Sequence, residues 1–118
     1  MWLTMQLAHV VGVLTLSGPC DSARTTVQIE QCLKRVLTAE EQQLGGVERD
    51  VAERLRGDNK AQFDSAGATW RSYRERECRA VYNANADGTI AASSFLGCEI
   101  ELTRSRRLLL VRIHSADR

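Results

Sequence analysis

The stretch Trp70-Arg71-Ser72-Tyr73-Arg74-Glu75-Arg76-Glu77-Cys78 decides the fold of this 118-residue chain. It holds one of two tryptophans, one of two tyrosines and one of four cysteines. On a helix, four side chains in and just after this stretch share one face: Trp70, Tyr73, Glu77 and Val81. We therefore predict a helix whose aromatic face packs in the core and whose last turn is held by its cysteine. A core role for this face is favoured over a binding surface made of the same residues.

The composition indicates one small, mostly helical domain. Aromatic residues make up only 5% of the chain, so the core must be mostly aliphatic. A single proline and few runs of β-branched residues favour helices over a β-sandwich. The 16 basic and 15 acidic residues leave a net charge of +1, which predicts no strong attraction to nucleic acid or to an anionic membrane.

The amino terminus has the pattern of a signal peptide. Residues 1–19 contain no Lys, Arg, Asp or Glu, and Leu7–Leu16 is an apolar run of ten. Such a run is too short for a membrane span, which needs about 20 residues, but it suits the apolar region of a secretory signal. Thr15 and Ser17 supply the small residues of a cleavage site. Because His9 interrupts the run and no basic residue precedes it, a buried amino-terminal helix or strand is the alternative.

The residues that follow predict an exported domain. Cys20 directly after the run is reminiscent of a lipoprotein, but Pro19 suits that signal poorly, so we predict a soluble product without stable membrane insertion. Four cysteines in so small a chain also favour an oxidising compartment. We thus expect residues 1–19 to be a signal peptide and residues 20–118 to be a periplasmic or secreted domain. Its first segment, Cys20–Thr26, has the sequence of an extended lead-in.

The first helical pattern follows the lead-in. Apolar side chains recur every three or four residues, with Glu40 filling the gap on the same stripe: Ile29, Leu33, Val36, Leu44, Val47, Val51 and Leu55. Thr25 or Thr26 can cap this helix, since Glu30 lies near the third position. Gly45-Gly46 interrupts the stripe, and each glycine costs about 1 kcal/mol relative to Ala. Because the stripe resumes in phase, we predict one helix rather than two.

Two further helices are expected. After a turn at Gly57–Asn59, a second helix runs from about Lys60 to Tyr82, with an inward face of Phe63, Ala66, Trp70, Tyr73, Glu77 and Val81. After a loop at Asn83–Thr89, a third helix spans about Ile90–Ile113, with an inward face of Phe95, Cys98, Leu102, Leu109 and Ile113. Leu108–Val111 is apolar on all sides and should be buried or touch a partner. The predicted fold class is all-α, a three-helix bundle stapled by disulfides.

The four cysteines allow three pairings. None forms a C-x-x-C pair, so a zinc site and thioredoxin-type redox chemistry are disfavoured. If the second and third helices are antiparallel about their loop, Cys78 lies opposite about Ser94, within a turn of Cys98. We therefore prefer Cys78–Cys98 and, by elimination, Cys20–Cys32. The rival set, Cys32–Cys78 with Cys20–Cys98, stays open at this point.

Neither metal binding nor catalysis is predicted. The loop Asn83-x-Asn85-x-Asp87-Gly88-x-Ile90 resembles the start of an EF-hand, but its position twelve is Ser94 and Asp87 is its single charge. A helix–helix turn explains these residues better. The histidines, His9 and His114, lie near the two ends of the chain, and no Ser or Cys is placed with a base and an orienting acid. We expect a protein that is not an enzyme and uses no cofactor.

Two sequence blocks together resemble a known family. The first is Trp70-x-x-Tyr73-Arg74-x-x-Glu77-Cys78, and the second, after Gly88, is Cys98-x-x-x-Leu102-Thr103-x-x-Arg106. They resemble the small secreted bacterial domain named after a mycobacterial lysozyme-inhibitor lipoprotein, over about Cys20 to Leu110. The resemblance implies an exported, all-helical, disulfide-bonded protein that inhibits lysozyme by occluding its cleft. The structural core that it implies is Trp70, Tyr73, Arg74, Leu102 and Arg106.

The chain departs from that family's usual pattern at several positions. In the first helix, Gly45 stands where such domains usually carry Asn, and Glu48 stands where they carry Tyr. Gly67 replaces a Gln three residues before the tryptophan, and Asp87-Gly88-Thr89 replaces a frequent Gly-Gly-Ser.

The partner expected from the resemblance is a protein, with lysozyme as the candidate. Animal lysozymes are commonly basic, so an acidic contact face is expected to steer binding. The acidic run on the first helix supplies such a face, although solvated surface charge explains it equally well: Glu40, Glu41, Glu48, Asp50 and Glu53. The loop that carries Asp87 is a second candidate to enter a cleft. The alternative function is an envelope structural or assembly module that binds another envelope protein through Leu108–Val111.

Overall fold

The computed structural model describes residues 18–115 and contains three α-helices in that range: α2 (Thr26–Arg54), α3 (Gly57–Ala84) and α4 (Ala91–His114). No strand occurs within residues 18–115. The predicted all-α, three-helix fold is confirmed. Most of the predicted signal peptide, residues 1–17, lies outside the described residues.

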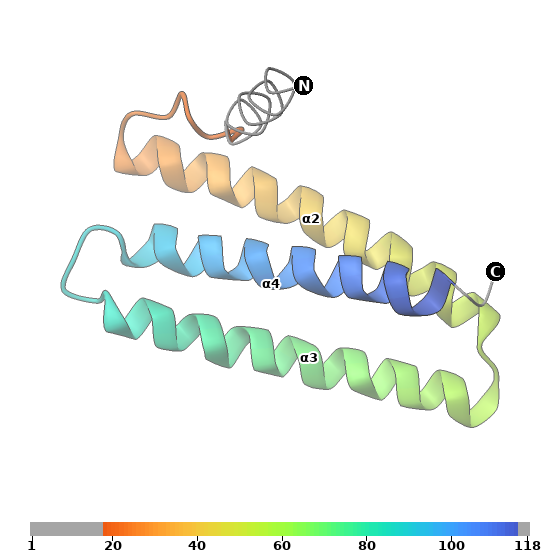
Figure 1. Cartoon of the computed structure of the whole chain (residues 1–118). Helices are drawn as coiled ribbons and strands as arrows, with labels where there is room; N and C mark the ends of the chain where they lie inside the picture. Colours follow the sequence, from red (N-terminus) through yellow and green to blue (C-terminus); the bar gives the residue numbers. More distant parts are fainter. Residues whose placement is uncertain (1–17, 116–118) are drawn as a thin grey trace, which may run out of the picture.

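The carboxyl-terminal helix is the central one. α4 lies between α2 and α3, and these two outer helices make little backbone contact with each other. α2 and α4 run in the same direction, and α3 runs back between their ends (Figure 1). Six side chains of α4 are buried in the packing against both neighbours: Ala91, Leu96, Glu99, Ile100, Thr103 and Leu110. The core is therefore organised around α4, and two of its buried side chains, Glu99 and Thr103, are polar.

α2 is a single helix with a capping box at its start. The Oγ1 atom of Thr25 accepts a hydrogen bond from the backbone N–H of Gln28 at 3.1 Å, and the Gln28 side chain accepts one from the backbone N–H of Thr25 at 3.3 Å. The capping partner is thus Gln28 rather than the expected Glu30. The helix continues through Gly45-Gly46, as predicted.

The prediction of a turn at Gly57–Asn59 is wrong, because α3 already begins at Gly57. The chain reverses at Leu55 and Arg56, which are both extended, and Gly57 has a φ of 54°. Only glycine adopts this left-handed conformation without steric cost, so two extended residues and one glycine suffice to connect the helices.

The inward face of α3 differs from the predicted one. It consists of Phe63, Gly67, Trp70, Arg74, Cys78, Val81 and Asn85, at spacings of three and four residues. Ala66, Tyr73 and Glu77, which were expected inside, are exposed, and Tyr73 is 50% accessible. The prediction that Tyr73 belongs to the core is therefore wrong. The disulfide of the fully buried Cys78 fixes the rotation of the helix, and this rotation points small and charged side chains toward α4.

The end of α4 also differs from expectation. Leu110 is buried with 3% exposure, but Leu109 and Ile113, which were predicted to face inward, are 41% and 54% exposed. Leu108 and Val111 are exposed as well. Among residues 18–115, α2 and α3 flank α4 on two sides, so they cover one leucine of this apolar segment and leave its other side chains exposed.

Both preferred disulfides are confirmed. Cys20 is bonded to Cys32, and Cys78 is bonded to Cys98. The first bridge ties the lead-in to the start of α2, and the second joins α3 and α4 near their connecting loop. The start of α2 and the α3–α4 loop lie at the same end of the molecule (Figure 1), so both bridges stabilise that end.

Candidate functional site

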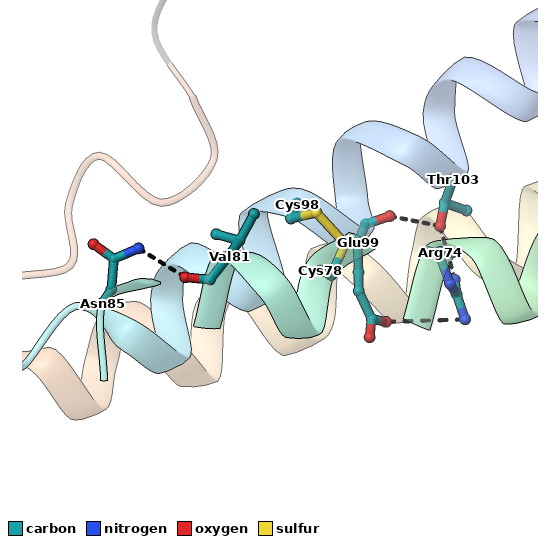
Figure 2. The surroundings of a disulfide bond; sticks show 7 residues. All are labelled: Arg74, Cys78, Val81, Asn85, Cys98, Glu99 and Thr103. Atoms are coloured by element: carbon teal, nitrogen blue, oxygen red, sulfur yellow. Dashed lines mark hydrogen bonds and ion pairs between the residues drawn. A yellow bond between two sulfur atoms is a disulfide. The ribbon is translucent and has the colours of Figure 1, made fainter. Parts of the chain in front are cut away.

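A buried polar contact joins α3 to α4 beside the second disulfide (Figure 2). The guanidinium of Arg74 donates a hydrogen bond at 2.8 Å to the hydroxyl of Thr103, which donates one to the carbonyl oxygen of Glu99 at 2.6 Å. Thr103 is fully buried, and the Glu99 carboxylate lies 3.9 Å from Arg74. Burial raises the pKa of Glu99 above the usual range of a glutamate, and the Arg74 charge opposes this rise in part.

Trp70 is surrounded by three guanidinium groups. Those of Arg74 and Arg106 lie 5.3 Å from the centre of its ring, and that of Arg71 lies at 5.8 Å. At these distances each cation is attracted to the ring. Arg74 and Arg106 are mostly buried, and Leu102 is partly buried. Of the five residues expected to form the structural core, Tyr73 alone lies on the surface.

Three of the five carboxylates of the expected acidic face on α2, those of Glu40, Glu41 and Glu48, are paired with arginines, whereas Asp50 and Glu53 are exposed. Glu40 is only 8% exposed, and its carboxylate bonds to Arg104 at 2.9 Å and to Arg107 at 3.4 Å. Glu41 pairs with the Arg74 guanidinium at 3.2 Å. Glu40 is therefore too buried to contact a partner, and the prediction that it belongs to a contact face is wrong.

Glu48 is held in the same way. Its carboxylate accepts two hydrogen bonds from Arg71, at 2.6 and 3.2 Å, and lies 3.6 Å from Arg106. The bond to Glu48 raises the pKa of Arg71. The ion pairs of these acidic residues connect α2 to α4, against which it packs, and to α3, with which it makes little backbone contact. The sequence did not reveal their role because their arginine partners lie 23 to 67 residues away.

A hollow of about 280 Å³ opens between α2 and α3. Its lining is Gly45, Glu48, Arg49, Ala52, Phe63, Asp64, Gly67 and Arg71. Three of these residues, Gly45, Glu48 and Gly67, are positions at which the chain departs from the pattern of the domains that it resembles. The departures therefore meet in space although they are far apart in sequence.

The loop between α3 and α4 forms the second notable surface, together with the ends of both helices. We call Tyr82–Ile90 the stapled tip, because the Cys78–Cys98 bridge lies directly behind it. Asn85 donates a side-chain hydrogen bond to the Val81 carbonyl at 2.8 Å, which fixes the end of α3. Asp87 is exposed, and Ile90 is 56% exposed. The tip thus presents apolar and acidic groups on a fixed backbone.

Residues 18–115 contain no cluster of three or more His, Cys, Asp or Glu side chains that could hold a metal ion. The EF-hand-like part of the loop therefore lacks a carboxylate cage in this structure. No helix in the same range is long and apolar enough to cross a membrane.

Comparison with known proteins identifies the family. A family model described as lysozyme inhibitor LprI matches residues 19–110. The chain belongs to the LprI family. No curated protein and no solved structure matches it. The match includes both disulfides, the Trp70 cluster, the hollow and the stapled tip, whereas Val111 and Ile113 lie beyond it.

Membership in the LprI family implies a non-enzymatic protein that binds another protein. Together with the two disulfides, it also indicates an extracytoplasmic location.

Sequence reasoning missed two residues of these surfaces, Arg49 at the hollow and Ile90 at the tip. An arginine on a helix and an isoleucine beside a loop have no distinctive pattern.

Proposed function

We propose that this LprI-family protein is a periplasmic or secreted inhibitor that occludes the cleft of a lysozyme with its stapled tip. The family match over residues 19–110 is the observation that carries the proposal, since it gives the class of partner. Inhibition is steric and involves no chemistry on the enzyme. Asp87, on the tip, remains an acidic contact residue, whereas Glu40, Glu41 and Glu48 of α2 are already paired with arginines.

The tip suits a cleft because it is narrow and fixed in position. It is the turn between two antiparallel helices, and the bridge Cys78–Cys98 holds those helices together within two turns of it. A segment that is already ordered loses little conformational entropy on binding, so more of its contact energy appears as affinity. Ile90 and the part-exposed ring of Tyr82 supply apolar contact, and Asp87 supplies charge complementary to a basic rim.

Two isoleucines give a matched test of this orientation. Ile90 at the tip and Ile113 at the opposite end of α4 have nearly equal exposure, 56% and 54%. The proposal predicts that the oxidised protein slows the clearing of a cell-wall suspension by lysozyme. Ile90→Ser should weaken inhibition at least about tenfold, because a central apolar contact becomes polar. Ile113→Ser should inhibit like the unchanged protein, and the reverse result would place the contact at the other end.

The contribution of charge at the tip to inhibition is tested by varying the salt concentration and by replacing Asp87. Asp87→Asn should weaken inhibition and reduce its dependence on salt between low and moderate ionic strength, because screening acts on exposed charge pairs. Failure of the unchanged protein to inhibit any of several lysozyme types would remove the proposal.

A second candidate function rests on the exposed end of α4. Leu108, Leu109, Val111 and Ile113 are all more than a third exposed, which is unusual for four large apolar side chains within six residues. This surface favours an envelope assembly module that binds another envelope protein. Capture of one envelope protein by the intact chain, lost in Leu108→Ser and retained in Ile90→Ser, would support this candidate over inhibition.

A further inference from the structure

At the α2 side of the hollow, two adjacent glycines occupy positions where a Cβ atom would fit. A Cβ atom at Gly45 would meet only Arg49, with Nη1 at 3.7 Å, and one at Gly46 would meet only Arg49, with Nη2 at 4.0 Å. Both are ordinary van der Waals distances, so the Cβ atom of an alanine would fit here without strain. Glycine weakens a helix interior, yet two adjacent glycines occur in the middle of α2. Their effect is to leave space above the helix beside Arg49.

Gly67 has a different role on the facing helix. A Cβ atom there would lie 3.4 Å from Arg71 Nη1, 3.5 Å from Glu48 Oε2 and 3.6 Å from Arg106 Nη2. These are ordinary van der Waals distances, so the Glu48–Arg71 pair lies directly beside α3 at this glycine. The pair forms a polar wall of the hollow in a fixed position, because two hydrogen bonds orient both planar groups.

The charges around the hollow leave a positive surplus. Glu48 is compensated by both Arg71 and Arg106, and Asp64 is compensated by Lys60 at 2.7 Å. Arg49 is exposed and makes no hydrogen bond or ion pair with any residue in the range 18–115. Arg71 is half-exposed at the rim of the same hollow. An anion in the hollow would therefore meet two accessible guanidinium groups, and this favours a carboxylate as ligand.

The size and lining of the hollow indicate what carries that carboxylate. A volume of about 280 Å³ lies just below the usual range of ligand pockets, roughly 300–1,000 Å³, so the ligand is small. The guanidinium groups donate hydrogen bonds, the carboxylates of Glu48 and Asp64 accept them, and Phe63 adds an apolar wall. The hydroxyls of a sugar can donate hydrogen bonds to the remaining lone pairs of these two carboxylates, and an aliphatic carboxylate has no donor for them.

From these observations we infer that the hollow binds a carboxylated saccharide of about one sugar unit. Its carboxylate lies between Arg49 and Arg71, and its hydroxyls bond to Glu48 and Asp64. The site is separate from the proposed inhibitory contact, since Gly67 is 17 residues from the end of α3 at Ala84, about 25 Å along the helix. Loss of one activity therefore need not affect the other.

The test uses two acidic sugars and their uncharged counterparts. N-acetylmuramate and glucuronate are titrated into the oxidised protein beside N-acetylglucosamine and glucose, and backbone amide NMR signals are followed. At least one acidic sugar should shift the amide signals of Gly45, Gly46 and Gly67, and neither uncharged sugar should do so. Equal shifts from a charged sugar and its counterpart, or no shift with either acid, would overturn the inference. Acetate that binds as tightly as the acidic sugars would overturn its saccharide part.

Variants then locate the site. Arg49→Gln should weaken binding of the acidic sugar about tenfold or more, because a charge-assisted bond is lost. Arg76→Gln is the matched control: Arg76 is also exposed and unpaired within residues 18–115, but it lies on the outer side of α3. Gly45→Leu should fill the hollow and abolish binding without lowering the melting temperature. Retained affinity in either Arg49→Gln or Gly45→Leu would contradict the inference, and lysozyme inhibition should be unchanged in both.

Discussion

Trp70 shows how a residue identified from sequence acquires its role from distant partners. Its ring lies among guanidinium groups from two helices, Arg71 and Arg74 of α3 and Arg106 of α4. These three cations gather around one ring, and the carboxylates of Glu41 and Glu48 of α2 balance part of their charge. Trp70 therefore stabilises the fold by organising charge as well as by burying apolar surface.

Replacement of Trp70 tests this role. Trp70→Ala should lower the free energy of unfolding by about 3 kcal/mol, because the change removes a large side chain and leaves the arginines facing a cavity. Trp70→Phe retains an aromatic face, so its free energy of unfolding should fall clearly less. Urea denaturation followed by circular dichroism measures both. A loss below about 1 kcal/mol for Trp70→Ala would mean that the tryptophan is a surface residue available for binding.

The raised pKa of Glu99 predicts that the stability of the protein depends on pH. This pKa is raised in the folded protein, chiefly by burial, so the folded state holds the Glu99 proton more tightly than the unfolded state does. The stability that this proton provides is present below the ordinary pKa of glutamate and is lost as the pH rises through the raised folded pKa. Glu99→Gln should therefore melt at a higher temperature than the unchanged protein at pH 7, with little difference near pH 4. An equal difference at both pH values would contradict this assignment.

At the scale of the helices, two glycines are expected to respond oppositely to alanine. Gly57→Ala should destabilise the protein by about 1 kcal/mol, because φ at this residue is 54° and a Cβ atom is strained there. Gly45→Ala should stabilise it by up to about 1 kcal/mol, since the added Cβ gains helix propensity in ordinary contact with Arg49. Thermal melts of the two variants measure the signs. A loss of stability in Gly45→Ala would show that α2 needs its glycine for packing.

α3 shows why apolar periodicity misjudged one helix face. Ala66, Tyr73 and Glu77 continue the stripe of Trp70 and Val81 by spacing, but the residues one position later, Gly67, Arg74 and Cys78, point inward. A glycine and an arginine have no apolar signal. Arg74 is favourable inside only because Thr103 and the carboxylates of α2 and α4 provide partners for its guanidinium.

For the whole molecule, reduction of the disulfides is the decisive perturbation. The bridges close loops with sequence separations of 12 and 20 residues, so each should contribute about 3 kcal/mol by restricting the unfolded chain. Reduction should lower the melting temperature markedly. Hydrogen exchange should increase most around the stapled tip and the start of α2, where both bridges lie. An unchanged melt with reductant would mean that the bridges do not support the fold.

The arrangement of the helices also determines which surfaces are free. α4 has neighbours on two sides, so the outer helices meet mainly through long arginine and glutamate side chains rather than through a shared apolar core. This arrangement produces the hollow beside Arg49 and leaves the end of α4 exposed. It also pairs three acidic residues of α2, Glu40, Glu41 and Glu48, with arginines, which favours the stapled tip as the proposed partner contact.

The sequence by itself determined the local and topological features. The spacing of apolar residues predicted three helices, and the stripe that resumes in phase after Gly45-Gly46 predicted that α2 is continuous. The short loop between α3 and α4 predicted that these helices are antiparallel, and this arrangement places Cys78 near Cys98. Two blocks around Trp70 and Cys98 were also enough to identify the family. Each of these inferences depends on residues close in sequence or linked by one tight connection.

Only the tertiary structure decided which charged residues are internal. Glu40 and Glu48 resemble solvated surface acids in sequence, because an ion pair between helices has no fixed spacing and its partners lie up to 67 residues away. The rotation of α3, the exposure of Tyr73 and the hollow beside Arg49 depend on the same packing. The physical reason is that a charge can be buried only where distant backbone segments bring a countercharge within bonding distance.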